Sequence, residues 1–258
     1  MIGKKFKGTK MQHIFFILFF FCSSSLAASH IYAFIGADTK SSVGPSCRQD
    51  RDRMADALET IADLTDFELK LTTYSGYKLS SKALSKWLKD IHPGRDDVVF
   101  FYYSGHGNRI KADNTRWPAM YFSYQKEHVA LTKVIDALKH KNARLSIILC
   151  DCCNDLPKGR KLTPKYTVVL PNFDVVQKAQ GLESLFVDIK GTIIASASSP
   201  GGLAWNTSKG GIFTNAFLYC LQHEMQRSSP SWKRIFDQTY TLCESLQKPQ
   251  VKLSIKDA

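Results

Sequence analysis

Residues 98–107 are VVFFYYSGHG, and residues 145–153 are LSIILCDCC. Each stretch begins with an apolar run whose length and β-branched or aromatic content predict a buried strand. Polar residues follow both runs, so that His106 comes just after the first and Cys153 just after the second. Between them, residues 127–141 carry apolar side chains at helical spacing. This strand–helix–strand unit predicts two parallel strands in one sheet, with His106 and Cys153 meeting at the edge where open α/β sheets bind ligands.

The alternation of strands and helices continues along the chain, whose 258 residues suffice for one α/β domain with a full core. Further strands are predicted at residues 30–36, 67–73, 192–196 and 249–253, and further helices at residues 80–91, 213–225 and 232–246. Another helix is predicted after the polar residues 41–46, with its apolar face at residues 54–64. Together these elements indicate an α/β fold with a doubly wound, mostly parallel six-stranded sheet flanked by helices.

Composition and charge are those of an ordinary globular protein. Hydrophobic residues make up 44% of the chain and charged residues 22%, which excludes an intrinsically disordered chain. The net charge of +12 would suit an acidic partner, but the lysines are scattered without any run of five or more. We therefore expect a solvated basic surface and no specific binding of nucleic acid.

Residues 1–28 have the three parts of a secretory signal peptide. They comprise a lysine-rich start, the apolar run IFFILFFF at 14–21 and the small residues SLAA at 25–28. The apolar run is shorter than the roughly 20 residues that a transmembrane helix needs. We predict a cleaved signal peptide and a secreted or periplasmic mature chain, 29–258, that is not bound to a membrane. An uncleaved signal anchor is the alternative.

Removal of the signal peptide leaves six cysteines in an oxidising compartment, where disulfides can form. They are Cys47, Cys150, Cys152, Cys153, Cys220 and Cys243. Their spacing does not assign any pairing, and at most two pairs remain if one of the six is a catalytic thiol. The cluster at 150–153 has no second pair at the spacing of a zinc ribbon, so we expect no metal site.

The positions of the His and the Cys fit nucleophilic catalysis. A cysteine attacks a carbonyl carbon as the thiolate, and a nearby imidazole such as His106 lowers its pKa and later protonates the leaving amine. Side chains alternate along a strand, so Asp151 and Cys153 point to one face and Cys152 to the other. This alternation favours Cys153 as the nucleophile and leaves Cys152 in the core. The N–H groups of Gly107 and Cys153 are candidate donors to a tetrahedral oxyanion.

The segments YSGHG at 103–107 and DCC at 151–153 resemble those of cysteine peptidases with the caspase-like fold. The resemblance is closest to the metacaspases and their bacterial relatives, which carry an Asp-Ser-Cys or Asp-Cys-Cys segment where caspases carry Gln-Ala-Cys. It covers most of the mature chain, because GIFT at 211–214 and KPQ at 248–250 are similar to the small-subunit part of that family. The resemblance implies a thiol endopeptidase that acts on proteins or peptides and needs no cofactor.

The resemblance also implies a substrate preference. Metacaspase-like enzymes cleave after Arg or Lys, whose side chain enters an acidic pocket. One carboxylate comes from a segment matched here by CRQD at 47–50, which assigns Asp50 to the pocket. Asp151 is the second carboxylate, and Ser104 lines the same pocket. Two carboxylates around a guanidinium would form strong charge-assisted hydrogen bonds.

By the same resemblance, the mature chain divides into a large-subunit-like part, 29–156, a loop, 157–190, and a small-subunit-like part, 191–258. The loop contains the basic residues Lys158, Arg160 and Lys161. A basic sequence in a long connection, beside a site specific for basic residues, makes this segment a candidate for self-cleavage. We expect the protein to be a monomer.

Three features depart from the metacaspase pattern. Asn154-Asp155 follows the nucleophile where the family has His-Ser-Gly, and Asp50 lies among three arginines, at positions 48, 51 and 53. Residues 108–150 contain only three widely spaced acids, at positions 113, 127 and 136, so we predict that the protein does not need calcium. Three alternatives remain open: cleavage after Asp by means of those arginines, an inert scaffold of the same fold that binds a partner, and a signal-anchored adaptor.

Overall fold

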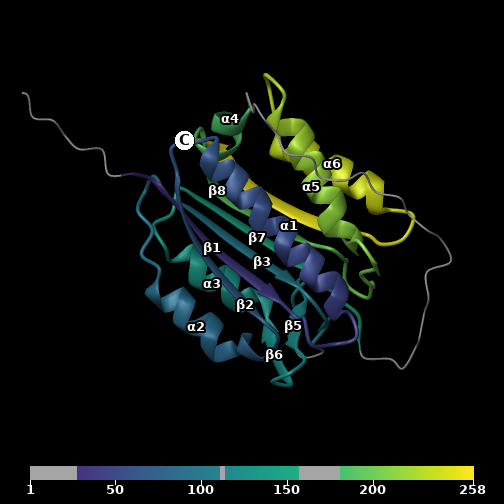
Figure 1. Cartoon of the computed structure of the whole chain (residues 1–258). Helices are drawn as coiled ribbons and strands as arrows, with labels where there is room; N and C mark the ends of the chain where they lie inside the picture. Colours follow the sequence, from purple (N-terminus) through teal and green to yellow (C-terminus); the bar gives the residue numbers. More distant parts are fainter. Residues whose placement is uncertain (1–27, 111–113, 157–180) are drawn as a thin grey trace, which may run out of the picture.

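A six-stranded sheet forms the centre of the computed structural model, which describes residues 28–110, 114–156 and 181–258 (Figure 1). Its strands are β1 (His30–Ala37), β2 (Glu68–Ser75), β3 (Val98–Ser104), β7 (Leu145–Asp151), β8 (Ile189–Ser196) and β11 (Gln250–Asp257). They lie in the order β11-β8-β7-β3-β1-β2, and only β11 runs antiparallel to its neighbour. The predicted doubly wound, mostly parallel six-stranded sheet is therefore confirmed.

The two strands that precede His106 and Cys153 are neighbours at the centre of this sheet. Every residue of β3 and of β7 is buried, as expected for strands that are covered on both faces. Their register pairs Val98 with Leu145 at one end and Ser104 with Asp151 at the other. The polar segments that follow the two strands therefore start side by side at the same edge of the sheet.

Helices cover both faces of the sheet (Figure 1). One face carries α1 (Gly44–Asp63), α4 (Leu182–Phe186), α5 (Ile212–Met225) and α6 (Trp232–Cys243), and the other carries α2 (Ser81–Asp90) and α3 (Leu131–Lys139). Alternation along the strands divides the apolar side chains between these layers. In β7, for example, Ile147 packs with α1 and α5, whereas Ile148 packs on the side of α2 and α3.

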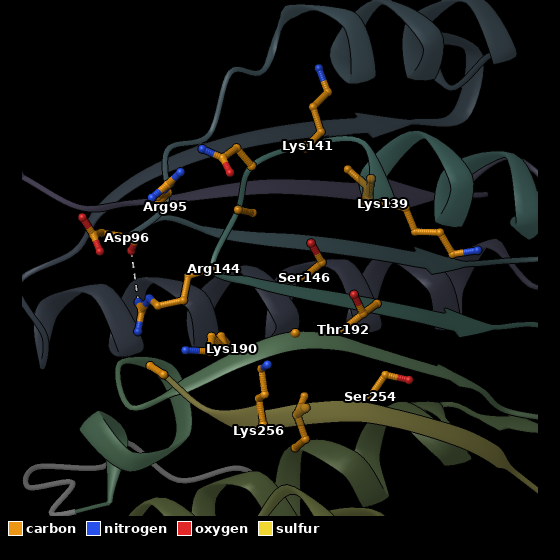
Figure 2. Close-up of a pocket in the computed structure, with 16 residues that line it drawn as sticks. Arg95, Asp96, Lys139, Lys141, Arg144, Ser146, Lys190, Thr192, Ser254 and Lys256 are labelled. Atoms are coloured by element: carbon orange, nitrogen blue, oxygen red, sulfur yellow. Dashed lines mark hydrogen bonds between the residues drawn. The ribbon is translucent and has the colours of Figure 1, made fainter.

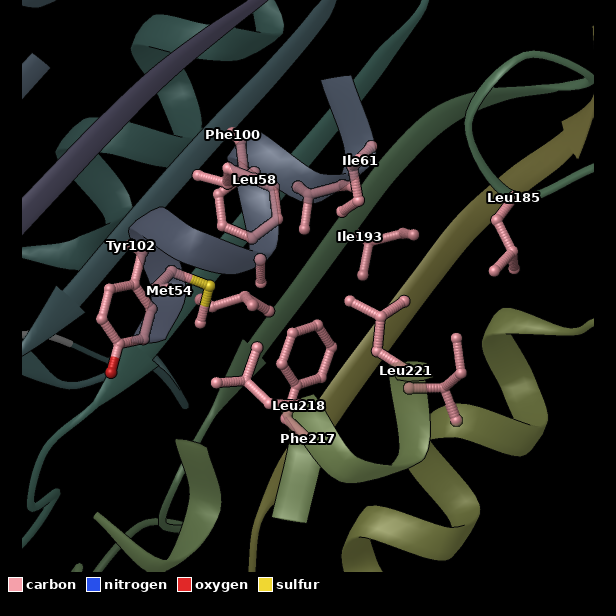
Figure 3. Close-up of a cluster of buried hydrophobic side chains, with 14 of the residues drawn as sticks. Met54, Leu58, Ile61, Phe100, Tyr102, Leu185, Ile193, Phe217, Leu218 and Leu221 are labelled. Atoms are coloured by element: carbon pink, nitrogen blue, oxygen red, sulfur yellow. The ribbon is translucent and has the colours of Figure 1, made fainter. Parts of the chain in front are cut away.

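The larger core lies between the sheet and helices α1 and α5. Figure 3 shows Leu58 of α1, Phe100 of β3, Ile193 of β8 and Phe217 of α5 pointing into the same space. All four side chains are buried. On the opposite face, aromatic rings from β1, α2 and β3 form a second core, in which the ring centroids of Phe34 and Phe101 are 5.3 Å apart.

Two small sheets lie beside the main one, and the sequence analysis did not predict them. One consists of β4 (Gly107–Asn108), β5 (Ala119–Phe122) and β6 (Glu127–Ala130), and the other of β9 (Asn206–Thr207) and β10 (Gly210–Gly211). The predicted helix at 127–141 was wrong at its start, because Glu127–Ala130 is strand β6 and the helix begins at Leu131. The apolar residues Val129 and Leu131 fit the spacing of a strand as well as that of a helix. Residues 127–130 form a strand because they pair with β5.

Three other boundaries also differ from the prediction. The predicted apolar face at 54–64 belongs to helix α1, which begins earlier, at Gly44. Its first turns bury Ser46, Cys47 and Asp50, which do not form the apolar stripe by which a helix is recognised in a sequence. Helix α4 and the first residues of β8 occupy part of the segment 157–190 that was predicted to be a loop. Strand β11 extends to Asp257 because it pairs with β8 along its whole length.

Some predictions fall on residues that the structure does not describe. The signal peptide lies almost entirely within residues 1–27, and the proposed self-cleavage residues Lys158, Arg160 and Lys161 lie within 157–180. Both therefore remain predictions. None of the helices in the described ranges combines the length and the apolar character needed to cross a membrane.

Replacement of Phe217 by Ala tests the role of the larger core. The ring is fully buried and stacks on Phe213 and Phe236, at centroid distances of 6.3 and 5.6 Å. Phe217→Ala should lower the free energy of unfolding by about 3–5 kcal/mol, because it removes apolar contacts and leaves a cavity. Urea denaturation measures this loss. Tyr240→Ala, at a 40% exposed ring on α6, is the control and should cost about 0.5 kcal/mol or less.

Candidate active site

A pocket of about 430 Å³ lies at the carboxyl edge of the sheet. This is the edge where open α/β sheets bind ligands, next to the point where the strand order reverses between β1 and β3. The pocket is lined by Ser42, Val43, Ser46, Cys47, Asp50, Ser104, Gly105, His106, Asp151, Cys153, Leu203, Ala204, Trp205, Asn206 and Gly211. The structure thus brings five of the six residues singled out in the sequence, all except Gly107, to the wall of one pocket.

His106 lies two residues beyond the end of β3 and is held mainly through its backbone. Its carbonyl oxygen accepts hydrogen bonds from the Tyr103 hydroxyl, at 2.8 Å, and from the Tyr121 N–H, at 2.9 Å. The imidazole Nε2 is 3.2 Å from the hydroxyl of Ser42 in the loop after β1. Ser42 was not among the predicted site residues, because a serine in a polar loop carries no distinguishing signal in the sequence.

Cys153 lies two residues beyond the end of β7, with its sulfur beside the backbone of Ala204. The N–H of Ala204 donates to Sγ at 3.3 Å. Burial raises the pKa of the Cys153 thiol to about 11, and the hydrogen bond from Ala204 opposes this shift only in part. The thiol is therefore protonated near neutral pH, so attack on a carbonyl carbon needs a base that takes its proton. His106 is the imidazole in the same pocket.

The two neighbouring cysteines are core residues, as predicted. Cys150 and Cys152 are buried, and their sulfur atoms are 3.3 Å apart on the side of α2 and α3. Burial also raises the pKa of the Cys152 thiol well above its ordinary value. All six cysteines in the described part of the chain are free thiols.

Gly107 lies outside the pocket lining but beside Cys152 and Cys153. The Tyr121 N–H donates a hydrogen bond to the His106 carbonyl. Hydrogen-bonded and non-hydrogen-bonded residue pairs alternate along an antiparallel ladder, so the next pair, Gly107 and Met120, is not hydrogen-bonded. The N–H of Gly107 therefore points away from β5, toward the segment that contains Cys153. A Cβ atom on Gly107 would come within 2.3 Å of the Cys152 sulfur, which explains why this position is a glycine.

Asp50 and Asp151 lie at the inner end of the pocket, and both are buried. Asp50 accepts hydrogen bonds from the Ser104 hydroxyl, at 2.6 Å, and from the Gly211 N–H, at 2.7 Å. Asp151 accepts from the N–H and the hydroxyl of Thr214, at 3.0 and 2.6 Å. The structure therefore brings together the two carboxyl groups and the serine that the sequence assigned to one pocket.

The two carboxyl groups hold protons more tightly than ordinary aspartates do. Burial, together with the negative charge of Asp151, raises the pKa of Asp50 to about 8. Burial likewise raises the pKa of Asp151 to about 6, against the opposing effect of its bonds from Thr214. Near neutral pH the pair therefore retains a proton, and a cation that entered the pocket would favour the fully ionised form.

Gly210 and Gly211 allow the chain to pass close to these carboxyl groups. A Cβ atom on Gly211 would come within 2.1 Å of an Asp151 carboxyl oxygen and 3.1 Å of an Asp50 oxygen. Gly210 has a φ of +110°, in the region that favours glycine. The segment GIFT at 211–214 stands out in the sequence only through the family resemblance, and no local signal indicates that Gly211 and Thr214 donate hydrogen bonds to Asp50 and Asp151.

The three arginines near Asp50 point elsewhere. Arg48 donates to the Thr39 carbonyl at 3.0 Å, Arg51 pairs with Asp52 at 2.7 Å, and Arg53 donates to the side chain of Asn215. None of the described residues that line the pocket is an arginine or a lysine. The pocket is therefore acidic. The helix dipole favours acidic residues in the first turn of a helix. Asp50 lies in the second turn of α1, so the dipole does not account for its presence.

Asn154, which departs from the metacaspase pattern just after Cys153, has a structural role. Its backbone N–H and carbonyl bond to Gly202 and Gly201, at 3.0 and 2.8 Å, and its side-chain amide donates to the Arg116 carbonyl at 2.8 Å. These bonds join the segment that follows Cys153 to the loop that leads to Trp205. The Trp205 side chain packs against Ile212 and its neighbours, and the residue forms part of the pocket wall.

Comparisons with known proteins agree with this fold. The protein-family model described as "Caspase domain" matches residues 35–256. Caspase-1 from Spodoptera frugiperda is similar in structure, with a TM-score of 0.53 and 15% identity over 87% of this chain and 86% of that one. Protein GSU0716 from Geobacter sulfurreducens is also similar, with a TM-score of 0.54 and 15% identity over 88% of this chain and 93% of that one.

A search of curated protein sequences gives no match. The two structural similarities, at 15% identity, support the fold alone. The family match is different, because it extends over most of the chain and includes the strands, the helices and every residue of the pocket. This chain belongs to the caspase domain family, a family of cysteine-type peptidases.

Proposed function

We propose that the protein is a cysteine endopeptidase that cleaves its substrates after Arg or Lys. The observation that carries this proposal is the position of two buried carboxyl groups in the pocket that also contains Cys153. The closeness to metacaspases in the sequence motifs supports the same preference. Secretion of the mature chain is part of the proposal and rests on the sequence of residues 1–28.

In the proposed reaction, each of these residues has a separate role in hydrolysis of the peptide bond. Cys153 Sγ attacks the scissile carbonyl carbon while its proton passes to His106, and the carbonyl oxygen becomes an oxyanion. The N–H groups of Gly107 and Cys153 stabilise this oxyanion. When the C–N bond breaks, His106 gives the proton to the leaving amine. Water then attacks the thioester with His106 as the base, which releases the acid and restores the thiol.

The acidic pair provides the specificity in this proposal. A guanidinium or ammonium group that enters the pocket meets Asp50 and Asp151, whose ionised forms have been disfavoured by burial. The cation reverses that cost, so binding and ionisation favour each other. The Ser104 hydroxyl, which already donates to Asp50, holds one carboxyl oxygen in place.

Cleavage after Asp, the first alternative, would need a cation in the pocket. Arg48, Arg51 and Arg53 are all engaged outside it. Arg53 is near enough for its charge to lower the pKa of Asp50, but its guanidinium donates to Asn215 and does not line the pocket. An acidic side chain would therefore meet two carboxyl groups and no cation among the described residues of the pocket wall, and like charges repel. This arrangement favours a basic substrate residue.

Replacement of each adjacent cysteine tests the assignment of the nucleophile. Cys153→Ala should lower kcat/KM for a fluorogenic peptide that ends in Arg by roughly 10³-fold or more, because the covalent step is lost. Cys152→Ala is the matched control and should keep most of the activity, since this side chain is buried on the other face. Equal losses in both variants would contradict the assignment. If folded, reduced wild-type protein cleaves no peptide at all, the inert scaffold is the better description.

The acidic pair should also give the specificity a pH dependence. We expect the ratio of kcat/KM for an Arg peptide to that for its citrulline analogue to rise with pH through about 6 and about 8. These are the pKa values of Asp151 and Asp50 in the folded chain, and only the ionised forms attract the guanidinium. Citrulline has nearly the shape of Arg without the charge, so any pH dependence of the chemical step that both peptides share cancels in the ratio. A ratio that stays flat from pH 5 to 9 would count against the acidic pair.

Asp50→Asn tests one member of the pair directly. An amide of the same size keeps an acceptor for the Gly211 N–H, but it removes a charge. The ratio for Arg over citrulline should fall by about 10- to 100-fold, as expected for loss of a charge-assisted hydrogen bond. Asp52→Asn is the control, because Asp52 is two residues away on α1, exposed and paired with Arg51. An unchanged ratio in Asp50→Asn would remove this residue from the pocket's function.

A further inference from the structure

A second cleft, of about 770 Å³, lies at the opposite edge of the sheet from the active site. It is formed by the C-terminal end of α3, the first residues of β7 and β8, and the last residues of β11 (Figure 2). Along β7, Ser146 in this cleft and Cys153 in the active site are separated by seven residues, or about 23 Å of strand. The cleft is therefore separate from the peptidase pocket.

The floor of the cleft is a row of hydroxyl groups. Ser146 of β7 is in register with Thr192 of β8, and Thr192 is in register with Ser254 of β11. Residues directly opposite each other in neighbouring strands have their side chains on the same face of the sheet. Three hydroxyls on adjacent strands can donate hydrogen bonds to a ligand that carries several acceptor oxygens.

Cationic side chains surround this floor. The cleft is lined by Arg95, Lys139, Lys141, Arg144, Lys190 and Lys256. Asp96 is the one acidic side chain among the described residues that line it. The cleft therefore carries a strong positive charge, which a neutral or cationic ligand would not satisfy.

Some of these cations are already held by the protein. Lys139 pairs with Asp136 outside the cleft at 3.1 Å, and Lys141 donates to the Ile91 carbonyl at 2.8 Å. Arg144 donates to the Asp96 carbonyl at 3.0 Å, the bond drawn in Figure 2. These contacts fix the walls. Lys141 has no carboxylate partner among the described residues, whereas the charge of Arg144 is opposed in part by the nearby carboxylates of Asp96, Asp97 and Asp188.

The arrangement of Lys190 and Lys256 is the strongest indication of a ligand. The two lysines are directly opposite each other in the antiparallel pair of β8 and β11, and both side chains line the cleft. Neither has an ion-pair partner within the ranges that the structure describes. Like charges at directly opposed positions of a sheet destabilise it, and an anion between them would reverse this effect.

We propose that this cleft binds a small molecule that carries several phosphate groups. Phosphate oxygens accept hydrogen bonds from lysines, arginines and hydroxyls alike, which are the donors present. The volume is that of a site for a small ligand. A long nucleic acid or polysaccharide would need a basic surface that continues beyond the cleft, whereas the opposed lysines and the row of hydroxyls lie together within it, which suits a compact ligand.

Calorimetric titration of the full chain with inorganic tripolyphosphate, near 0.15 M salt, tests this proposal. We expect saturable binding of one tripolyphosphate per chain that weakens as the salt concentration rises. Lys190→Gln combined with Lys256→Gln should lower the affinity by about 10- to 100-fold, as expected for lost charge-assisted contacts. The single variant Lys256→Gln, at an exposed side chain, should show a smaller loss in the same direction.

Lys252→Gln is the matched control. Lys252 is exposed on the same face of β11 but does not line the cleft, so its loss should leave the affinity within about twofold. Cys153→Ala should bind tripolyphosphate as the wild type does, because the two sites are at opposite edges. Absence of saturable binding would overturn the proposal, and so would an equal loss in Lys252→Gln. Tighter binding of citrate, of a heparin oligosaccharide or of single-stranded RNA than of tripolyphosphate would also overturn it.

Discussion

The parallel pairing of β3 with β7 is the contact on which the rest of the structure depends. Both strands are buried along their whole length, and their register places Ser104 opposite Asp151. A shift of one residue in either strand would turn its side chains to the wrong faces and expose apolar groups to water. Because this register aligns the ends of the two strands, the polar segments after Ser104 and after Asp151 begin side by side. The packing of the core therefore also determines where His106 and Cys153 lie.

Burial of Asp50 and Asp151 costs free energy as long as the pocket is empty. Two carboxyl groups are removed from water beside each other, and the hydrogen bonds from Ser104, Gly211 and Thr214 compensate only part of that cost, as the raised pKa values of both groups indicate. In the proposed function, binding of a cation would recover this free energy. Discrimination between substrates would then arise from the protein's own desolvated charges, in addition to the fit of the side chain.

The sequence predicted those parts of the structure that depend on local periodicity. The apolar runs of β3 and β7 identified the central strands, and side-chain alternation placed Cys152 in the core and Cys153 in the pocket. The elements that were missed, such as β6, are short or have ambiguous periodicity, and tertiary pairing decides them.

Within the pocket, the predicted residues were those with a recognisable motif. The contact of His106 with Ser42 and those of the acidic pair with Gly211 and Thr214 join positions far apart in the chain, and nothing in their local sequence specifies such contacts. The sequence also did not predict where the three arginines near Asp50 point, because their partners, such as Asn215 for Arg53, lie far along the chain.

The pocket is assembled from both sides of the segment 157–180. Asp50 and Ser104 precede that segment and Gly211 follows it, yet they are joined by hydrogen bonds. The two sides also share the main sheet, because β7 pairs with β8 from Leu145 opposite Gly191 to Cys150 opposite Ser196. A break in the backbone between them would therefore produce a tightly associated heterodimer, since a contact of this kind resembles a domain core cut in half. The integrity of the site is a property of the fold and does not require a continuous covalent chain.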